Sequence, residues 1–165
     1  MRERGLAGAS VDEVMSAAGL TRGGFYNHFE DKLAMLSEGF ERAFDESAEN
    51  LFAKGLPERG EAWLEAATRR YLSEGHLDDP GGGCALPAIS GEVARSSPEL
   101  RRAFSAQLER MLEGVALRLG GPDARARAIV FLATCMGGLA LARVVPERST
   151  AREILAACRA AVSKV

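Results

Sequence analysis

The sequence predicts an all-α protein in which a small N-terminal head with two short helices precedes a larger helical body. Apolar residues recur three and four positions apart along most of the chain, which is the repeat of helices packed on one face. Clusters of glycine and proline interrupt this repeat and divide the chain into separate helices. No stretch is a convincing strand. We expect two domains, a head over 1–38 and a body over 39–165.

Composition and charge limit the classes of function. The chain has 165 residues, 47% of them hydrophobic, with a formal net charge of −2 and a pI of about 5.8. An overall basic charge that would attract nucleic acid non-specifically is absent, which counts modestly against DNA binding. Cys84, Cys135 and Cys158 fit neither a zinc site nor a disulfide framework, so we expect a reducing cytoplasm and no metal or cofactor.

We expect no export signal and no membrane segment. The first residues are charged and polar, unlike a signal peptide. The longest uncharged stretch, 128–142, is shorter than the roughly 20 apolar residues that cross a bilayer. We interpret it as a buried helix.

The head is predicted to begin with a short helix after Ser10. Ser10 and Glu13 form a capping box, in which the hydroxyl accepts from a first-turn N–H and the carboxylate reaches back to the Ser10 N–H. Gly19 is expected to end this helix, and Leu20 to turn back into the core. The apolar stripe is Val11, Val14, Met15 and Ala18.

A second short helix is predicted after a tight turn, with Thr21 as its cap. Phe25 and Phe29 are four residues apart and are expected to face inward. The outward residues are then small, polar and able to form hydrogen bonds: Arg22, Gly23, Gly24, Tyr26, Asn27 and His28. Two short helices joined in this way are a common device for entering the DNA major groove.

The stretch SVDEVMSAAGLTRGGFYNHFEDKLAML closely resembles the DNA-binding signature of the TetR family of bacterial transcriptional regulators. In that family the second helix of the motif enters the major groove. The resemblance assigns Thr21, Arg22, Gly23 and Gly24 to base edges, Tyr26 and Lys32 to phosphates, and Asn27 and His28 to either. Ser10, at a helix N-terminus, is a further phosphate candidate. Family members carry a whole helix before the glycine that is Gly5 here, so we expect the head to be N-terminally incomplete.

The body is predicted to contain six helices. The first, 31–54, leaves the head and enters the body, which makes it the lever able to transmit a shift between them; its apolar stripe is Leu33, Leu36, Phe40, Phe44 and Leu51. The others are expected at 61–73, 84–96, 98–119, 123–145 and 151–163, with a flexible connection at 76–83.

A mostly apolar ligand pocket is expected in the middle of the body. Its candidate lining residues are Trp63, Tyr71, Cys84, Phe104, Leu108, Met111 and Met136. Each of them is also explained as plain core, which is the more frequent role of apolar residues at helical spacing. Cys84 at a helix start is a minority candidate for a sensing thiol with a lowered pKa. A nucleophile or phosphate site at 81–84 is disfavoured, because neither His28 nor His76 has an evident reason to lie nearby.

The last two helices are expected to form a homodimer interface. The helix 123–145 is apolar on most of its circumference and must be covered on most sides. Small residues that allow close helix approach are Ala133, Gly137, Gly138, Ala140 and Ala142. In the family that the motif resembles, these two helices of each subunit form a four-helix interface. A monomeric core remains the alternative.

The resemblance therefore implies a ligand-responsive regulator without enzymatic chemistry. It is expected to be a repressor that binds a palindromic operator in double-stranded DNA and is released by a small apolar or amphipathic effector. The first alternative is a helical small-molecule-binding protein or enzyme that has lost DNA binding. The second is an interaction module that dimerises without ligand or DNA.

Overall fold

The computed structural model describes residues 1–164, and within that range it is all-helical with no strand. Residue 165 of the predicted body lies outside the described residues. The α-helices are α1 (Val11–Ala17), α2 (Lys32–Ser47), α3 (Gly60–Tyr71), α4 (Glu74–Asp78), α5 (Leu86–Ala94), α6 (Pro98–Leu119), α7 (Ala124–Val144) and α8 (Arg148–Val162). Two 3₁₀ segments, η1 (Ala7–Ala9) and η2 (Arg22–Asn27), lie in the head, and a π-helical segment, η3 (Ala48–Ala53), follows α2.

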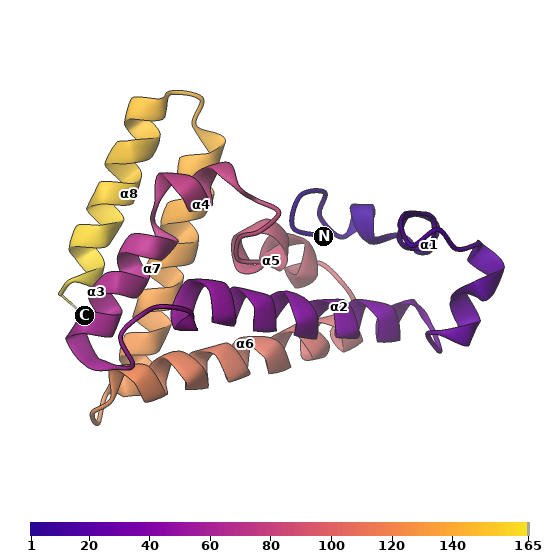
Figure 1. Cartoon of the computed structure of the whole chain (residues 1–165), viewed down its shortest axis with the longest axis horizontal. Helices are drawn as coiled ribbons and strands as arrows, with labels where there is room; N and C mark the ends of the chain where they lie inside the picture. The colour runs from indigo at the N-terminus through magenta and orange to yellow at the C-terminus, as the bar shows by residue number, and fades with distance from the viewer. Residues whose placement is uncertain (165) are drawn as a thin grey trace.

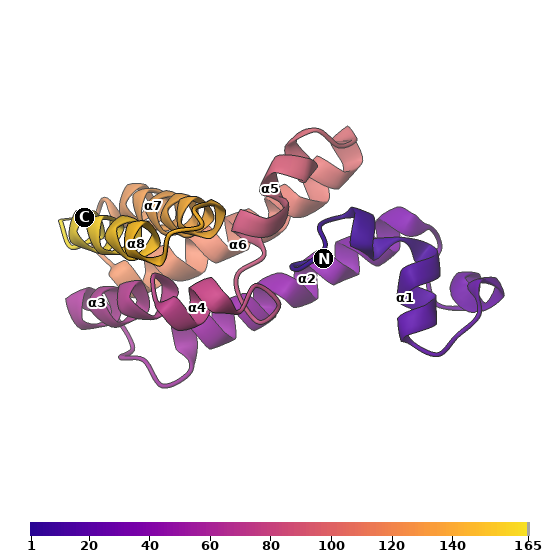
Figure 2. The same cartoon turned by 90° about the horizontal axis from the view of Figure 1, so that it is seen from above.

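The molecule is elongated, with the head at one end of α2 and the paired helices α7 and α8 toward the other (Figure 1). The view from above shows α1 at the same end, whereas the N-terminus lies over the middle of α2, near α5 (Figure 2). The predicted all-α fold is confirmed. The predicted boundary after residue 38 falls inside α2, which belongs to both parts, so the division into two domains stays a prediction.

The lever helix forms as predicted and is fastened to α6. Asp31 caps α2, and its carboxylate accepts a hydrogen bond from the Ala34 N–H at 2.8 Å. Phe40 and Phe44 are buried and meet the Phe104 ring edge-on, with centroids 5.3 and 5.2 Å away. The sequence predicted one helix over 31–54, but the last turns of this range, 48–53, form the π-helix η3. The head is thus joined to the body through a continuous, well-packed helical element.

The body core is built around Trp63. Its indole is fully buried and packs on Phe52 and Phe131, and its Nε1 donates to the Phe52 carbonyl at 2.8 Å. The Phe52 ring in turn stacks on Tyr71, with centroids 5.9 Å apart. This cluster joins η3, α3 and α7 into one hydrophobic core.

The segment 76–83 is not the fully flexible connection that its glycines suggested. Residues 74–78 form α4, and the His76 ring is buried, with its Nδ1 2.7 Å from the Tyr71 carbonyl oxygen. Glycine and proline content alone predicted a loop, but burial of Leu77 and His76 fixes the first half as a helix. The remaining body helices match their predicted ranges to within about three residues.

The uncharged stretch 128–142 lies within α7, which matches the predicted helix 123–145 to within one residue at each end. The helix α7 has 21 residues and a mean hydropathy of 1.6, so by length and composition it is one helix able to cross a membrane. The uncharged stretch within it, 128–142, is shorter than the roughly 20 apolar residues that cross a bilayer, and arginines flank it on both sides. Length and composition of this kind are equally typical of a core helix, and α7 packs against α6 and α8.

Two adjacent glycines on α7 give a prediction about packing between α7 and α8. A Cβ on Gly138 would lie 2.6 Å from Cys158 Sγ and 3.0 Å from Cys158 Cβ, whereas a Cβ on Gly137 meets nothing within 4 Å. We expect Gly138→Ala to cost about 1–3 kcal/mol of folding free energy by overpacking. Gly137→Ala should gain up to about 1 kcal/mol from helix propensity. Urea unfolding of both variants checks this; equal midpoints would show that α7 and α8 are not in close contact at Gly138.

Candidate nucleic-acid interface

The first helix of the head is capped at both ends by its own residues. The Ser10 Oγ accepts from the Glu13 N–H at 3.2 Å and also lies 2.9 Å from Glu13 Oε2. The cap was predicted, but the Glu13 carboxylate bonds to the Ser10 hydroxyl where a bond to the Ser10 N–H was expected. Gly19 has φ +71°, and the bonds Gly19 N–H to Ser16 O and Leu20 N–H to Met15 O form a Schellman motif.

Two apolar residues predicted to face the core do not do so. Leu20 is 46% exposed, and Ala18, one residue beyond α1, is exposed as well. The αL turn at Gly19 satisfies the last carbonyls of α1 through backbone bonds alone. Met15, with 2% of its surface exposed, is therefore the buried residue through which α1 packs against the core.

The second element of the motif is a 3₁₀ helix where an α-helix was expected. The N–H of Gly24 bonds to the Thr21 carbonyl and that of His28 to the Phe25 carbonyl, both with three-residue spacing. Two consecutive glycines weaken an α-helix, and short segments commonly adopt the tighter winding. The Thr21 side chain forms no capping bond, so that expectation is wrong. Phe25 is buried and touches Phe29 at a centroid distance of 5.5 Å, which anchors the element.

Most of the predicted DNA-contacting residues lie on the exposed side of this element. Tyr26 is 77% exposed, with one edge against Phe25. Gly24 faces Met15 and is half-buried, and Ser10 is also half-buried. The exposed members of the set are Thr21, Arg22, Gly23, Tyr26, Asn27, His28 and Lys32. Their roles toward bases and phosphates stay predictions.

An ion pair within the head was missed by sequence reasoning. Arg22 Nη1 lies 2.9 Å from Asp12 Oδ2, and both side chains are largely exposed, at 75% and 61%. The pair links the first turn of α1 to the start of η2. A separation of ten residues across a turn gives no periodic signal in the sequence, so only the fold brings these charges together.

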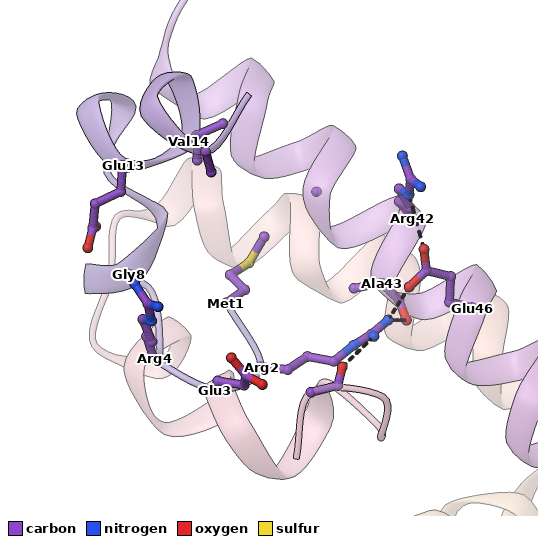
Figure 3. A pocket seen from close by; sticks show the side chains of 13 residues that line it. Met1, Arg2, Glu3, Arg4, Gly8, Glu13, Val14, Arg42, Ala43 and Glu46 are labelled. Carbon is purple, nitrogen blue, oxygen red and sulfur yellow. Dashed lines mark hydrogen bonds and ion pairs between the residues drawn. The ribbon is translucent and has the colours of Figure 1, made fainter. Parts of the chain in front are cut away.

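A hollow of about 620 Å³, lined by both charged and apolar side chains, lies between the N-terminal segment, α1 and α2 (Figure 3). Arg2 reaches across it and donates to the carbonyls of Gly81 and Ala43 and to the Glu46 carboxylate, at 2.8, 3.0 and 2.8 Å. Hydrogen bonds from Arg2 and from Arg42 hold the Glu46 pKa below its ordinary value. None of the predicted ligand-pocket residues lines this hollow.

The predicted ligand residues lie in the body core. Trp63, Tyr71 and Cys84 are fully buried, Phe104 and Met111 are buried, and Leu108 and Met136 are half-buried. Their assignment to a pocket stays a prediction. No group of three or more His, Cys, Asp or Glu side chains within residues 1–164 is arranged to hold a metal.

Around Tyr71 the fold creates a polar cluster within this core. The Tyr71 hydroxyl is buried without a hydrogen bond, and burial, together with the neighbouring Cys84 thiol, raises the pKa of Tyr71 well above its ordinary value. Burial also raises the pKa of the Cys84 thiol, in contrast to the lowered pKa of the sensing hypothesis. The Cys84 N–H donates to His76 Nε2 at 2.9 Å, so the expectation that no histidine lies near Cys84 is wrong.

His76 is expected to make folding sensitive to acid. Its Nε2 accepts a hydrogen bond, so the ring is neutral with its proton on Nδ1, directed at the Tyr71 carbonyl. Burial, reinforced by the charge of Arg143, lowers the His76 pKa below its ordinary value of 6.5. The neutral ring therefore stabilises the fold fully above pH 6.5, and this contribution is lost as the pH falls through the lowered folded-state pKa.

Thermal unfolding between pH 5 and 8 checks this expectation. The parent chain should lose stability toward pH 5, and His76→Gln should be less stable throughout but lose part of the dependence on pH. His28→Gln, which replaces an exposed histidine in the head, is the matched control and should keep the parent's profile. An unchanged profile in His76→Gln would contradict the assignment.

Comparisons with known proteins agree with this geometry. Residues 1–38 match the family model described as bacterial regulatory proteins, tetR family. The structure is similar to the reduced form of NemR from E. coli, with a TM-score of 0.72 and 20% identity over 99% of this chain and 89% of that one. It is also similar to a TetR transcriptional regulator from Chloroflexus aurantiacus, with a TM-score of 0.73 and 24% identity over 96% of this chain and 83% of that one. No curated protein matches the chain.

Proposed function

We propose that this chain, whose residues 1–38 match the model for bacterial regulatory proteins of the tetR family, is a ligand-responsive repressor of that family. It acts in the cytoplasm as a homodimer on a palindromic operator, and a small apolar or amphipathic effector releases it. No chemical step is needed for this function. The observation that carries the proposal is the exposed polar surface of η2, held in place by the buried Phe25.

The surface of η2 has the groups that DNA recognition requires. Arg22 can read guanine edges in the major groove, and Gly23, which has no side chain, allows the backbone to approach the bases closely. Tyr26 and Lys32 are exposed on the same head and suit phosphate oxygens. Ser10 is a weaker phosphate candidate, because its hydroxyl is already bonded twice to Glu13.

The exposed side of α7 supports the dimer. Ile129 and Val130 are 46% and 48% exposed, and Leu141 and Val144 are 58% and 76% exposed. On a helix these residues fall on one face, which also contains Gly137 and Ala140. A second copy of α7 and α8 would cover this face and place two heads at one twofold axis, as a palindrome requires.

The Tyr71 region and the lever supply the means of coupling. An effector entering the body core would find an unpaired buried hydroxyl, that of Tyr71, as a hydrogen-bond partner. Arg110 of α6 forms ion pairs with two acids of α2: its Nη2 lies 2.6 Å from Asp45 Oδ1, and its Nη1 lies 3.2 Å from Glu41 Oε1. A shift of α6 in the body would therefore move the lever helix α2. Effector and operator then oppose each other through their different preferences for the position of the heads.

Fluorescence anisotropy with a duplex from the chain's own promoter region, over a salt series, tests the proposal. We expect tight binding with a steep negative salt slope and a clear preference over scrambled duplex. Lys32→Ala should weaken binding to all duplexes. The slope of the logarithm of the binding constant against the logarithm of the salt concentration should become shallower by about 1 for each lost phosphate contact. Lys54→Ala, which removes an exposed charge from the body, is the control and should leave both unchanged.

The opposite result would favour a different class of protein. If the chain remained a folded dimer but bound neither this duplex nor any member of a randomised pool, the repressor would be rejected. A small molecule retained in the body would then support a ligand-binding protein without DNA binding.

A further inference from the structure

The ion pair between Asp12 and Arg22 is the only one within residues 1–164 that joins the two elements of the DNA-binding motif. Both side chains are mostly exposed, and exposed ion pairs contribute little to folding stability. Its effect is therefore on the direction and the charge of the Arg22 side chain.

The ion pair with Asp12 uses only one of the three nitrogens of the Arg22 guanidinium. One bond joins Arg22 Nη1 to Asp12 Oδ2 at 2.9 Å, and no other partner of Arg22 is described. The Nη2 and Nε donors remain available as a planar fork, which matches the O6 and N7 acceptors of guanine in the major groove. A fixed plane matters for such two-point contacts, because a freely rotating arginine meets phosphates as readily as bases.

The carboxylate also changes what Arg22 attracts. An arginine without a partner at the DNA surface is drawn to the nearest phosphate by charge alone. Asp12 cancels that charge locally and repels phosphate, while the short-range hydrogen bonds to a base edge remain. Asp12 is further favoured in this place because it lies in the first turn of α1, at the positive end of the helix dipole.

We propose that Asp12 is a positioning residue that directs Arg22 to a base, and that each operator half-site accordingly contains a guanine read by Arg22. This inference rests on the proposed function and names the chemistry of the sequence that it recognises. Asp12 acts on specificity only by orienting the Arg22 side chain, and Asp12 itself contacts no base.

The test uses the full chain and an operator duplex selected by it from a randomised pool. Affinities for the operator and for a scrambled duplex are measured by anisotropy for Asp12→Ala, Glu30→Ala, Arg22→Ala and the double variant at positions 12 and 22. Glu30 is the matched control, since it is an exposed acid of the same head that forms no ion pair among the described residues. Circular dichroism confirms that each variant is folded.

We expect Asp12→Ala to lower the ratio of operator to scrambled affinity about tenfold and to strengthen binding to scrambled duplex. Glu30→Ala should strengthen both and leave the ratio unchanged. In the Arg22→Ala background, loss of Asp12 should no longer change the ratio. Replacing the half-site guanine by 7-deazaguanine should weaken the parent and leave Arg22→Ala unaffected.

Two outcomes would overturn the inference in distinguishable ways. If the parent prefers its operator but Asp12→Ala behaves like Glu30→Ala, Asp12 has no positioning role and the repressor proposal stands. If no duplex in the pool is preferred by the parent, both the inference and the repressor proposal fail.

Discussion

Leu141→Lys is expected to separate the proposed dimer and to weaken operator binding by about 100-fold or more. Leu141 is 58% exposed in the single chain, so a lysine there should not harm the fold of one subunit. In a dimer through α7 the same position is covered, and an unpaired buried charge opposes association. Two linked heads gain about 10²–10⁴ in avidity over one, and a monomer loses that gain.

Sedimentation or light scattering, together with anisotropy on the operator, measures both effects. Leu117→Lys on α6 is the control, because that leucine is 81% exposed but lies on a different helix from the proposed interface. It should leave the mass of the assembly unchanged. A Leu141→Lys variant that remained dimeric and bound the operator normally would place the interface elsewhere.

Trp63→Ala is expected to cost about 3–5 kcal/mol of folding free energy, which is the usual range for emptying a buried tryptophan site. The indole is fully buried, packs on Phe52 and Phe131, and carries the Arg118 guanidinium 5.9 Å from its ring centre. Much of the domain's marginal stability would be lost with it. Chemical unfolding at a fixed protein concentration measures the change, since subunit association also contributes.

Trp63→Phe separates the hydrogen bond of the indole from its volume. Phenylalanine keeps an aromatic ring but leaves the buried Phe52 carbonyl without its donor, so the smaller loss of about 1–3 kcal/mol is expected. Equal losses in Trp63→Phe and Trp63→Ala would show that the hydrogen bond to Phe52, and not the packing, dominates at this site.

The helical pattern of the sequence predicted the elements that bury one broad apolar face. Phe40 and Phe44 on the lever, and Trp63 and Tyr71 on α3, are buried as their spacing indicated. The motif at 10–29 likewise predicted the cap at Ser10 and the turn at Gly19. These features depend on neighbours three or four residues away, which a single sequence displays directly.

The features that sequence reasoning missed depend on contacts between distant segments or on small energy differences. The winding of η2 is decided by a balance between two glycines and the anchor Phe25. The burial of His76 against Cys84 and the pairing of Asp12 with Arg22 arise only when separate elements meet. The range of α7, by contrast, was predicted to within one residue at each end, because Asp123 and Pro146 bound its apolar stretch.

The π-helical segment η3 has a consequence for aligning this chain with its relatives. A π turn holds one more residue than an α turn, as the bond from the Lys54 N–H to the Glu49 carbonyl at 2.8 Å illustrates. Such a turn absorbs an inserted residue while the helix before it and the packing after it keep their register. A relative with an uninterrupted α-helix here would therefore align with a one-residue gap within 48–53, and not in the loop before Trp63.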